Sequence, residues 1–268
     1  MKNYNKVSII IPTFNSGFFI HETIDSCKKQ TYQNIEIIVV DDCSTDGTTL
    51  EALKTYSGLR LFKNRENLGI SKTINFGASQ ATGDFIIFLG HDDILPSFHV
   101  ERMVQAFDAD TSFVHCNALK IDQYNRLMSL ARDPRQQLSK TQQIFKHLAV
   151  ENFIQSCGLM INRKMFVRID GWDESYRLFG EWLSYIKLAQ LGKVKYSQDT
   201  FAYYRVHKSS TMRLINRSYV KDILSYKNTC RSKSFQLVKR SDRSIIFWLK
   251  RTSIIVKENL NYQRNKFR

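Results

Sequence analysis

The sequence predicts an α/β protein with a mostly parallel central sheet, helices on both faces, and a basic helical C-terminal tail. Short apolar runs rich in β-branched residues alternate with stretches of helical spacing through residues 7–89. This alternation is typical of parallel strands joined by helical crossovers, because a parallel sheet needs cover on both faces. A chain of 268 residues can bury a large core in one or two domains.

Strands and helices alternate in the first part of the chain. Apolar runs predict the strands, which are 7–11, 35–40, 59–62 and 85–89. Apolar positions spaced by three and four residues predict the helices, which are 18–30, 48–56 and 71–79. Pro12 ends the first strand, and Ser44 or Asp46 is a suitable N-cap for the second helix.

The second half of the chain carries mixed signals. A strand is predicted at 113–118 and an apolar run follows at 154–161. A helix is predicted at 182–191, where Gly192 ends it. Residues 129–143 are polar and contain a proline, which predicts a loop.

The net charge of +15 is concentrated near the C-terminus. Residues 213–268 carry 15 Lys/Arg and 3 Asp/Glu, a net charge of +12, which leaves +3 for the residues before them. A cationic excess favours nucleic acid, a membrane surface or a phosphorylated substrate as partner, although it can also be a merely soluble surface. Nucleic acid is the weaker alternative. A nucleic-acid-binding groove would gather cations around the fold, whereas the residues before 213 carry a net charge of only +3.

Residues 213–268 are predicted to lie on an anionic membrane surface. In the segment 244–260, apolar residues fall close to one helical face and cations largely to its sides, which is the pattern of an interfacial helix. The apolar residues are Ile245, Trp248, Leu249, Ile255 and Val256, and the cations are Lys250, Arg251 and Lys257. Alternatively, these helices pack on the rest of the fold or on a second subunit of a homo-oligomer.

Cysteine usage and apolar lengths predict the compartment. The five cysteines are scattered without a C-x-x-C pair, which argues against a zinc site and a disulfide framework and for a reducing compartment. The apolar run near the N-terminus is too short for a signal peptide, and no stretch approaches the roughly 20 apolar residues that span a bilayer. We expect a cytoplasmic protein, peripheral on the inner face of the cell membrane.

Three polar clusters follow predicted strands and should meet at one edge of the sheet, where open α/β sheets bind ligands. They are 12–15, 41–42 and 91–93, and two of them contain an acid pair. Loop amides can satisfy such a pair, or it can hold Mg²⁺ or Mn²⁺, whose charge offsets the repulsion. The chain has no Walker A or G-x-G-x-x-G sequence, so a phosphorylated ligand would be held largely through the metal.

Four segments resemble, in order and spacing, those of family 2 glycosyltransferases, which have the Rossmann-like GT-A fold. They contain VDDCSTDGT (40–48), FLGHDD (88–93), FGEW (179–182) and YYRVH (203–207), and the similarity covers about residues 5–212. The resemblance implies an inverting, metal-dependent hexosyltransferase that moves a sugar from a nucleotide sugar, most often a UDP-sugar. The acceptor would be a hydroxyl of a cell-surface glycan or of a lipid-linked acceptor, in polysaccharide biosynthesis.

The resemblance also implies a division of the chain. A catalytic domain would span 1–212, with a nucleotide-sugar-binding half at about 1–118 and an acceptor-binding half at 119–212. The basic tail at 213–268 would contact a membrane or an oligomer partner.

The matching residues receive roles from the resemblance. Glu181 falls at the position of the family's general base, which takes a proton from the acceptor hydroxyl. Asp92 and Asp93 would coordinate Mn²⁺ or Mg²⁺, with His207 completing the contacts. The residues expected at the nucleotide sugar are Pro12, Thr13, Asn15, Asp41, Asp42, Lys72 and Asp92, with Asp42 as the first choice for holding the base.

Side chains expected at the acceptor leave alternatives open. Trp172 and Trp182 can stack on a sugar ring or pack in the core. Asp173 can bind acceptor hydroxyls or simply begin a helix. His91 is equally a ligand or a bystander, and His115, in an apolar run, is expected to be a satisfied core histidine.

The sequence departs from the family pattern at three places. Gly90 replaces the first acid of the usual D-x-D-D sequence, which predicts weaker metal affinity. The pair GE at 180–181 replaces E-D, so the base is one methylene longer, and TIN at 73–75 replaces A-R-N, which leaves Lys72 as the nearby cation. A nucleotide-sugar-binding protein that has lost catalysis is therefore an alternative function.

Overall fold

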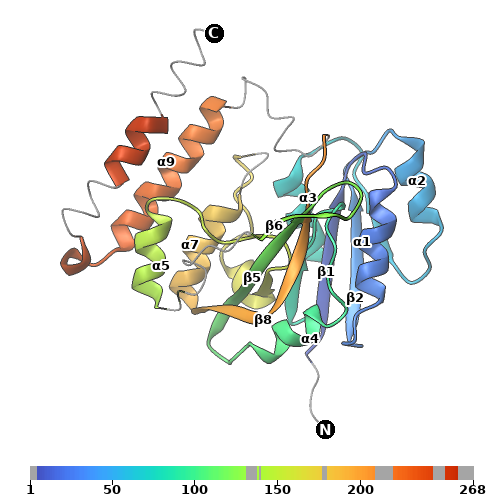
Figure 1. The fold of residues 1–268 in the computed structure, drawn as a ribbon, viewed down its shortest axis with the longest axis horizontal. Helices are drawn as coiled ribbons and strands as arrows, with labels where there is room; N and C mark the ends of the chain where they lie inside the picture. The colour runs from blue at the N-terminus through green and yellow to red at the C-terminus, as the bar shows by residue number, and fades with distance from the viewer. Residues whose placement is uncertain are drawn as a thin grey trace.

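A sheet with helices on both faces forms the centre of the molecule (Figure 1). The computed structural model describes residues 5–130, 138, 140–176, 180–208, 220–243 and 251–258. Within them the strand order is β3-β2-β1-β4-β7-β5-β6, and β8 also pairs with β5. The strands are β1 (Val7–Thr13), β2 (Ile35–Asp41), β3 (Arg60–Lys63), β4 (Phe85–Phe88), β5 (Thr111–Ile121), β6 (Leu127–Leu130), β7 (Met160–Asn162) and β8 (Lys193–Arg205).

The first part of the sheet is parallel. β1 pairs in parallel with β2 and β4, and β2 pairs in parallel with β3, so their carboxyl ends lie at one edge. β7 runs antiparallel between β4 and β5, and β8 pairs in parallel with β5. The predicted α/β fold with a mostly parallel sheet is confirmed.

Different helices cover the two faces of the sheet. Successive side chains of a strand point to opposite faces, and in β1 Ile10 joins one core while Ile9 and Ile11 join the other. α1, α2 and α4 cover the face of Ile9, and α3, α5, α6, α7 and α9 cover the face of Ile10. The helices are α1 (Phe19–Lys28), α2 (Gly47–Lys54), α3 (Ile70–Gln80), α4 (His99–Gln105), α5 (Thr141–Leu148), α6 (Arg163–Arg168), α7 (Glu181–Leu191) and α9 (Val220–Leu237).

The second half differs from the sequence prediction. The loop expected at 129–143 is wrong at its ends, because β6 extends to Leu130 and α5 begins at Thr141, while 131–137 and 139 lie outside the described residues. β8 was not expected from the sequence. Its register with β5 shifts twice, and such irregularities interrupt the alternation of apolar and polar residues that identifies a strand.

Part of the basic tail packs on the fold. α9 packs against α5 and α7, and its residues Tyr226 and Cys230 are buried in the same core as α7. The buried Arg231 of α9 pairs at 2.8 Å with Glu258, which belongs to the helical residues 251–258. The residues of the predicted interfacial face that lie outside the described residues are Ile245, Trp248, Leu249 and Lys250.

The described helices do not include a membrane span. None of them combines the length and the apolar content that crossing a bilayer requires.

Gly77 permits the close approach of α3 to the sheet. A Cβ atom at this position would lie 2.5 Å from Cγ2 of Ile10 and 3.2 Å from Cγ2 of Val40. We expect Gly77→Ala to lower the free energy of unfolding by about 1–3 kcal/mol through overpacking, although alanine favours the helix. Gly47→Ala is the matched control, because a Cβ there meets nothing within 4 Å. Equal stability of the two variants in denaturant unfolding would contradict the steric assignment.

Candidate functional site

The carboxyl ends of β1, β2 and β4 meet at one edge of the sheet. Thr13 and Asp41 are register partners at the ends of β1 and β2. The loop 90–93 follows β4, which lies on the other side of β1. Strand order therefore reverses at β1, and such a switch point is where open α/β sheets bind ligands. The three polar clusters predicted from the sequence come together here.

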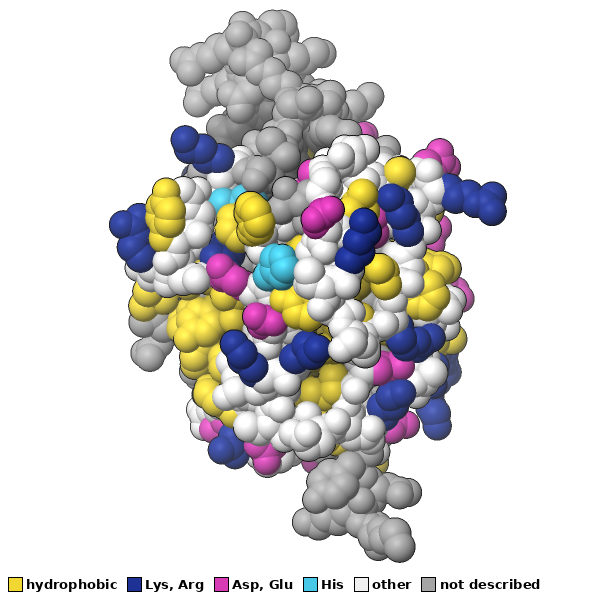
Figure 2. Space-filling model, turned by 90° about the vertical axis from the view of Figure 1, so that its right-hand side faces the viewer, with side chains coloured by type: hydrophobic (Ala, Val, Ile, Leu, Met, Phe, Trp, Pro, Cys, Tyr) yellow, Lys and Arg dark blue, Asp and Glu magenta, His cyan; other side chains and the backbone are white. Residues whose placement is uncertain are grey.

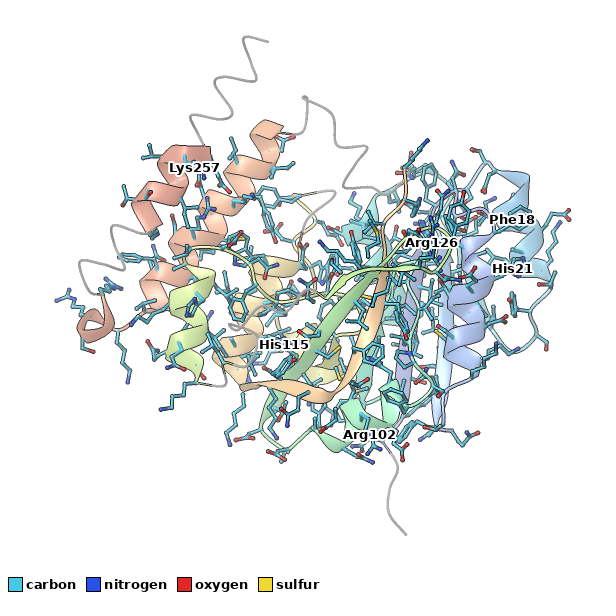
Figure 3. The ribbon with its side chains drawn as sticks, viewed as in Figure 1. Phe18, His21, Arg102, His115, Arg126 and Lys257 are labelled. Atoms are coloured by element: carbon cyan, nitrogen blue, oxygen red, sulfur yellow. The ribbon has the colours of Figure 1, made fainter. Side chains whose placement is uncertain are left out.

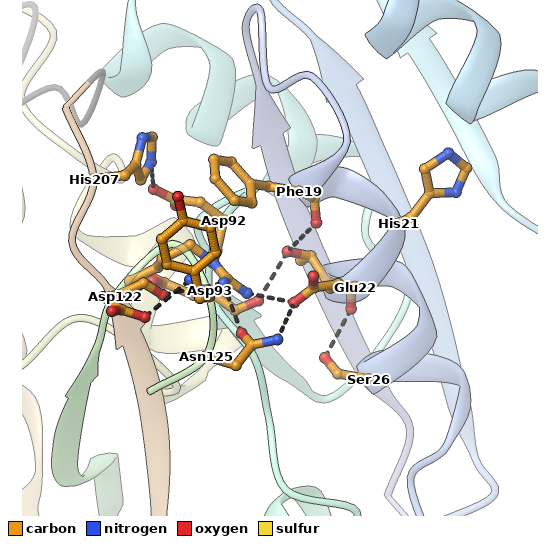
Figure 4. A network of polar contacts seen from close by, with 12 residues as sticks. Phe19, His21, Glu22, Ser26, Asp92, Asp93, Asp122, Asn125 and His207 are labelled. Carbon is orange, nitrogen blue, oxygen red and sulfur yellow. Dashed lines mark hydrogen bonds and ion pairs between the residues drawn. The ribbon is translucent and has the colours of Figure 1, made fainter. Parts of the chain in front are cut away.

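Asp92 and Asp93 are held in place by residues at the end of β8 (Figure 4). Oδ2 of Asp92 lies 2.8 Å from Nε2 of His207. Oδ1 of Asp93 accepts a hydrogen bond from the backbone N–H of Arg205 at 3.0 Å, and its carbonyl accepts one from Oγ1 of Thr23 at 2.8 Å. The three predicted metal ligands thus lie near one another, but Nε2 of His207 is directed at Asp92, and the role of the three as ligands stays a prediction.

Gly90 leaves room for the two carboxylates. A Cβ atom at Gly90 would lie 3.0 Å from Oδ1 of Asp92 and 2.8 Å from Oδ2 of Asp93. Oδ1 of Asp92 and Oδ2 of Asp93 therefore both lie close to this glycine. Hard carboxylate oxygens in such a pair fit Mg²⁺ or Mn²⁺. Among the described residues no group of three or more His, Cys, Asp or Glu could hold a metal, so substrate oxygens and water would have to complete its shell.

The two carboxyl groups have opposite pKa shifts. Burial and the negative charge of Asp92 raise the pKa of Asp93 to about 8. Burial also acts to raise the pKa of Asp92, but the hydrogen bond from His207 and the nearby His91 outweigh it, so that pKa lies below its usual value. At neutral pH without a cation, Asp92 is ionised and Asp93 mostly keeps its proton.

Arg205 organises this loop and was not singled out from the sequence. Its side chain is fully buried. Its guanidinium donates to the carbonyl of Asp92 at 2.7 Å, to Oδ1 of Asn125 at 2.7 Å and to Oε2 of Glu22 at 2.6 Å. Figure 4 shows these contacts converging from α1, the β5–β6 turn and the loop after β4. Only its place two residues before His207 in YYRVH could have drawn attention to it.

The ring of Phe19 lies against both basic groups. The Arg205 guanidinium lies 4.8 Å from the ring centroid, and the His207 ring centroid lies 4.7 Å from it. An aromatic face attracts a cation such as the guanidinium of Arg205. Phe19 therefore helps to orient the side chains that hold residues 90–93, the acid loop.

The carboxylate of Asp42 accepts three hydrogen bonds from within the protein. Its Oδ1 accepts hydrogen bonds from Nδ2 of Asn64 and the backbone N–H of Leu68, both at 2.8 Å, and its Oδ2 accepts from the N–H of Gly69 at 2.9 Å. These bonds fix the loop that leads into α3. Asp42 therefore acts within this loop, and its predicted place at the nucleotide base stays a prediction without structural support.

Asp41 differs from Asp42 because only one of its two carboxylate oxygens accepts a hydrogen bond from the described residues. Its Oδ1 accepts from the N–H of Ser44 at 2.9 Å. Its Oδ2 is buried and has no hydrogen-bond partner among the described residues, although Nζ of Lys63 lies 3.7 Å away as an ion-pair partner. Oγ1 of Thr13, its register partner, is likewise buried without a hydrogen-bond partner in the described part of the chain. Both residues end neighbouring strands at this edge of the sheet.

The other residues predicted at the nucleotide sugar surround this edge. Pro12 lies within β1, one residue before Thr13. Asn15 has a positive φ of 48°, and its Oδ1 accepts from the N–H groups of Thr45 at 2.8 Å and Asp46 at 3.2 Å, so it braces the loop after β2. Lys72 is exposed in the first turn of α3.

Trp172 and Trp182 lie in the core. Their exposed fractions are 7% and 4%, and both belong to the cluster that packs on the face of Ile10. The structure therefore favours the packing alternative for both rings, and sugar stacking stays a prediction. Asp173 is half-buried beside Trp172, where its Oδ1 accepts from the N–H of Ser175 at 3.0 Å.

α3 holds the segment that leads to Glu181. Nδ2 of Asn75 donates to the carbonyl of Trp172, and Oδ1 of Asn75 accepts from its N–H, both at 2.9 Å. Oγ of Ser71 donates to the carbonyl of Tyr176 at 2.9 Å. Because α3 also begins at the Asp42 loop, one helix connects the edge where the polar clusters meet with the segment before Glu181.

Glu181 is the first residue of α7. Its Oε2 accepts a hydrogen bond from the N–H of Gly180 at 3.0 Å. Burial raises its pKa above the usual value, although the hydrogen bonds from backbone N–H groups act to lower it. A carboxylate with a raised pKa binds a proton more readily, which suits a general base.

His115 lies in the interior on β5 (Figure 3). Its place in the core is as expected, but neither ring nitrogen has a hydrogen-bond partner among the described residues, so the expectation of a satisfied histidine is wrong. Phe113, Phe153 and Tyr196 lie around the ring. Burial lowers the pKa of His115 to about 3, which keeps it neutral.

The raised pKa of Asp93 predicts a pH dependence of stability. An unfolded aspartate ionises near pH 3.9, whereas folded Asp93 keeps its proton up to about pH 8. Between these values the folded state binds more protons, so the contribution of this group to the free energy of unfolding should fall as pH rises. Asp93→Asn should remove this contribution, because an amide resembles the protonated carboxyl and its oxygen still accepts from Arg205.

The measurement is denaturant unfolding between pH 4 and 8 in the presence of a chelator. Asp110→Asn is the control, because Asp110 is exposed and its pKa is lowered by the hydrogen bond from Lys193. The control should keep the slope due to Asp93. Parallel pH profiles for wild type and Asp93→Asn would show that the pKa of Asp93 is not raised.

Solved structures share this fold. S. aureus TarS 1–349 in complex with UDP-GlcNAc aligns with 94% of this chain and 80% of its own, with a TM-score of 0.66 and 19% identity. A mannosyltransferase from Pyrobaculum calidifontis in complex with GDP-Man and Mn²⁺ aligns with 99% and 89%, with a TM-score of 0.61 and 15% identity. At these identities the likeness shows the fold, which is that of GT-A glycosyltransferases.

Sequence relatives point to the same family. An uncharacterized glycosyltransferase of Rickettsia typhi is 31% identical over 209 residues, and one of Nostoc sp. is 28% identical over 211 residues. The alignments cover 76% and 75% of this chain and 65% of each relative, so the chain spans about two thirds of their length. The family described as Glycosyl transferase family 2 matches residues 8–169. The resemblance found in the sequence is thereby confirmed, and the chain belongs to glycosyl transferase family 2.

Proposed function

We propose that this glycosyltransferase moves a sugar from a nucleoside diphosphate sugar to a hydroxyl group, with inversion at the anomeric carbon. One observation carries the proposal. Oδ2 of Asp41, which lacks a hydrogen-bond donor among the described residues, lies at the same sheet edge as the carboxylates of Asp92 and Asp93 beside Gly90. The Asp41 oxygen suits a nucleobase, and the paired carboxylates suit a metal-bound diphosphate. A cell-surface glycan or lipid-linked acceptor is proposed from the family resemblance.

Asp41 is the proposed contact of the base. A carboxylate only accepts hydrogen bonds, so it fits the imide N–H of uracil or the N1–H of guanine. We place a UDP-sugar first and a GDP-sugar second. UDP-GlcNAc and GDP-Man, which TarS and the Pyrobaculum mannosyltransferase bind, are the first donors to test.

The diphosphate is proposed to lie beside the acid loop. Asp92 and Asp93 would hold Mn²⁺ or Mg²⁺ through the oxygens above Gly90, while His207 orients Asp92. When bound, the cation stabilises negative charge on the departing nucleoside diphosphate. Lys72, exposed on α3, is the proposed side-chain cation for the same group.

Glu181 is the proposed general base. It takes the proton from the acceptor hydroxyl as that oxygen attacks the anomeric carbon. Its raised pKa supports this role. Asp173, half-buried near the start of the same segment, is the proposed contact for acceptor hydroxyls. A binding protein without catalysis would show donor binding but no turnover, so both must be measured.

The experiment compares donor binding with donor turnover. Thermal stabilisation by UDP-GlcNAc and by GDP-Man is measured with and without Mn²⁺, and release of nucleoside diphosphate is followed in the same samples. We expect one donor to stabilise the protein more in Mn²⁺ and to be consumed. Absence of stabilisation by nucleotide sugars of every base would overturn the proposed function, and stabilisation without turnover would support the binding protein.

Substitutions of the two neighbouring aspartates should separate an effect on donor binding from an effect on folding. Asp41→Ala should raise the KM or Kd for the donor roughly 10- to 100-fold, the value of a hydrogen bond to a charged group, with little change in kcat. Asp42→Ala should mainly lower the melting temperature, because three donors in its loop lose their acceptor. If Asp42→Ala weakens donor binding more than Asp41→Ala in folded protein, the base contact is Asp42.

We further propose that the basic tail contacts an anionic membrane surface, with the protein peripheral on the cytoplasmic side. On the face of α1 and α2, the described Lys and Arg are interspersed with Asp and Glu (Figure 2). The described tail lies on the opposite side of the molecule, where Lys257 is exposed (Figure 3). Around α9, Lys233, Lys239 and Arg240 are also exposed, while the other face of α9 is buried.

Charge reversal tests this contact without disturbing the core. The full chain should sediment with vesicles that contain anionic lipid, and high salt should weaken the binding. Combined Lys233→Glu, Lys239→Glu and Arg240→Glu should weaken it at least about 100-fold, at about 1 kcal/mol per cation.

A charge-matched control reverses exposed cations elsewhere. It combines Lys29→Glu, Lys54→Glu and Lys164→Glu, all on exposed residues outside the tail. This control should bind vesicles nearly as wild type does. Equal weakening by both triple variants would mean that only net charge matters, and absence of binding by wild type would assign the tail to the fold or to an oligomer.

A further inference from the structure

The N-terminus of α7 lacks a cap of its own. Gly180 is the N-cap residue and has no side chain to accept the free N–H groups of the first turn. A Cβ at this position would lie 2.8 Å from Cβ of Trp172 and 3.1 Å from Oγ of Ser71, so a capping side chain would meet close neighbours there. The helix that carries Glu181 must therefore obtain an acceptor from elsewhere.

Tyr226 of α9 provides that acceptor. The backbone N–H of Leu183, in the first turn of α7, donates a hydrogen bond to the Tyr226 hydroxyl at 3.1 Å. Only 2% of Tyr226 is exposed. A side chain that lies 43 positions later in the chain thus performs the task of a local N-cap.

Neighbouring contacts hold Tyr226 in this position. Its ring centroid lies 4.6 Å from that of Tyr176, whose carbonyl is bound to Ser71 of α3. One turn further along α9, the buried Arg231 lies with its guanidinium carbon 5.9 Å from the ring centroid of Trp182 and donates to the carbonyl of Val150 at 2.7 Å. α9 is therefore anchored on both sides of the first turn of α7.

We propose that Tyr226 is a positioning residue for Glu181, because its hydroxyl caps α7 and thereby fixes the turn that presents the Glu181 carboxylate. The proposal rests on the proposed role of Glu181 as the general base. It extends the functional machinery into the basic C-terminal segment, since α9 then contributes to the reaction as well as to the core.

The groups around Glu181 support this coupling. The titratable side chains that sense its charge are Tyr185 of α7 and Tyr226 and Cys230 of α9. Burial and then the charge of Glu181 raise the pKa of Tyr226, so its hydroxyl stays neutral at physiological pH. Removal of this hydroxyl would leave the N–H of Leu183 without its acceptor. The Glu181 carboxylate, in the same turn, would then move toward that N–H, which lowers its pKa and turns it away from the acceptor.

The first experiment requires no substrate. Glutamate labelled with ¹³C at the carboxyl carbon is titrated by NMR in wild type and in Tyr226→Phe, and the Glu181 signal is identified by its loss in Glu181→Gln. We expect Glu181 to titrate roughly 1 pH unit lower in Tyr226→Phe than in wild type. Identical titrations in folded proteins would overturn the proposal.

The second experiment uses turnover of the donor found in the binding screen, with water as acceptor where no glycan acceptor is known. Tyr226→Phe should lower kcat about tenfold, because a displaced general base accepts the proton less effectively, with the donor KM unchanged. In the Glu181→Gln background the same substitution should have no further effect, because Tyr226 acts through Glu181.

Controls separate this role from folding. Tyr56→Phe removes a hydroxyl that bonds Asp25 at 3.0 Å on the other face of the sheet, so it should keep wild-type titration and turnover even if it melts earlier. An additive loss in the double variant would make Tyr226 merely structural. If Glu181→Gln itself keeps full turnover, the base assignment fails, while the NMR titration still decides whether Tyr226 positions Glu181.

Discussion

The geometry of the acid loop depends on one buried cation. The Arg205 guanidinium is removed from water, and a buried charge is strongly destabilising unless it is paired and hydrogen-bonded. Its acceptors come from three places, which are Glu22 on α1, Asn125 in the β5–β6 turn and the carbonyl of Asp92. Since loss of any one partner leaves the cation incompletely paired, these elements are held in place together. The positions of the Asp92 and Asp93 carboxylates are in this way fixed by groups that lie outside their loop.

α3 connects the two sides of the site, as Arg205 connects the elements around the acid loop. At its N-terminal end, Oγ1 of Thr73 shares Asn64 with the carboxylate of Asp42. Through Ser71 and Asn75 the same helix holds the backbone of the segment that leads to α7. A rigid helix bonded at both places keeps the nucleotide edge and the proposed base in a constant relation. Its close approach to the sheet depends on a glycine, because any side chain at that position would meet Ile10.

Features set by local pattern could be predicted from the sequence. Runs of β-branched residues identify β1, β2 and β4, and acid pairs directly after them identify the ligand edge, because parallel neighbours end together. Which of Asp41 and Asp42 has its carboxylate engaged by the loop before α3 could not be predicted. The answer depends on whether the N–H groups of Leu68 and Gly69 reach a carboxylate more than 25 residues away. The residues next to the acid pair in the sequence do not show this.

The same limit applies to longer-range partners. Arg205 contacts Glu22 across 183 positions of the chain. Tyr226 contacts the N–H of Leu183 from a segment for which the sequence left both a membrane surface and packing on the fold open. Trp182 begins an amphipathic helix, so its pattern fits a wall of a binding site as well as a core. Its 4% exposure and its place in the core that α9 also joins favour packing, while sugar stacking stays a prediction. A sequence shows which chemical groups the side chains carry, whereas tertiary packing determines which group each side chain contacts.

The cap that α9 supplies to α7 has a consequence for the order in which the protein matures during synthesis. Domains commonly begin to fold from the N-terminal side while the ribosome is still adding residues. β1 to β4 and their helices can assemble at that stage, but the first turn of α7 lacks the Tyr226 hydroxyl until α9 has emerged. A nascent chain can therefore bring the carboxyl ends of β1, β2 and β4 together well before the helix that carries Glu181 gains this hydrogen bond, and premature termination just ahead of α9 would leave the N–H of Leu183 without it.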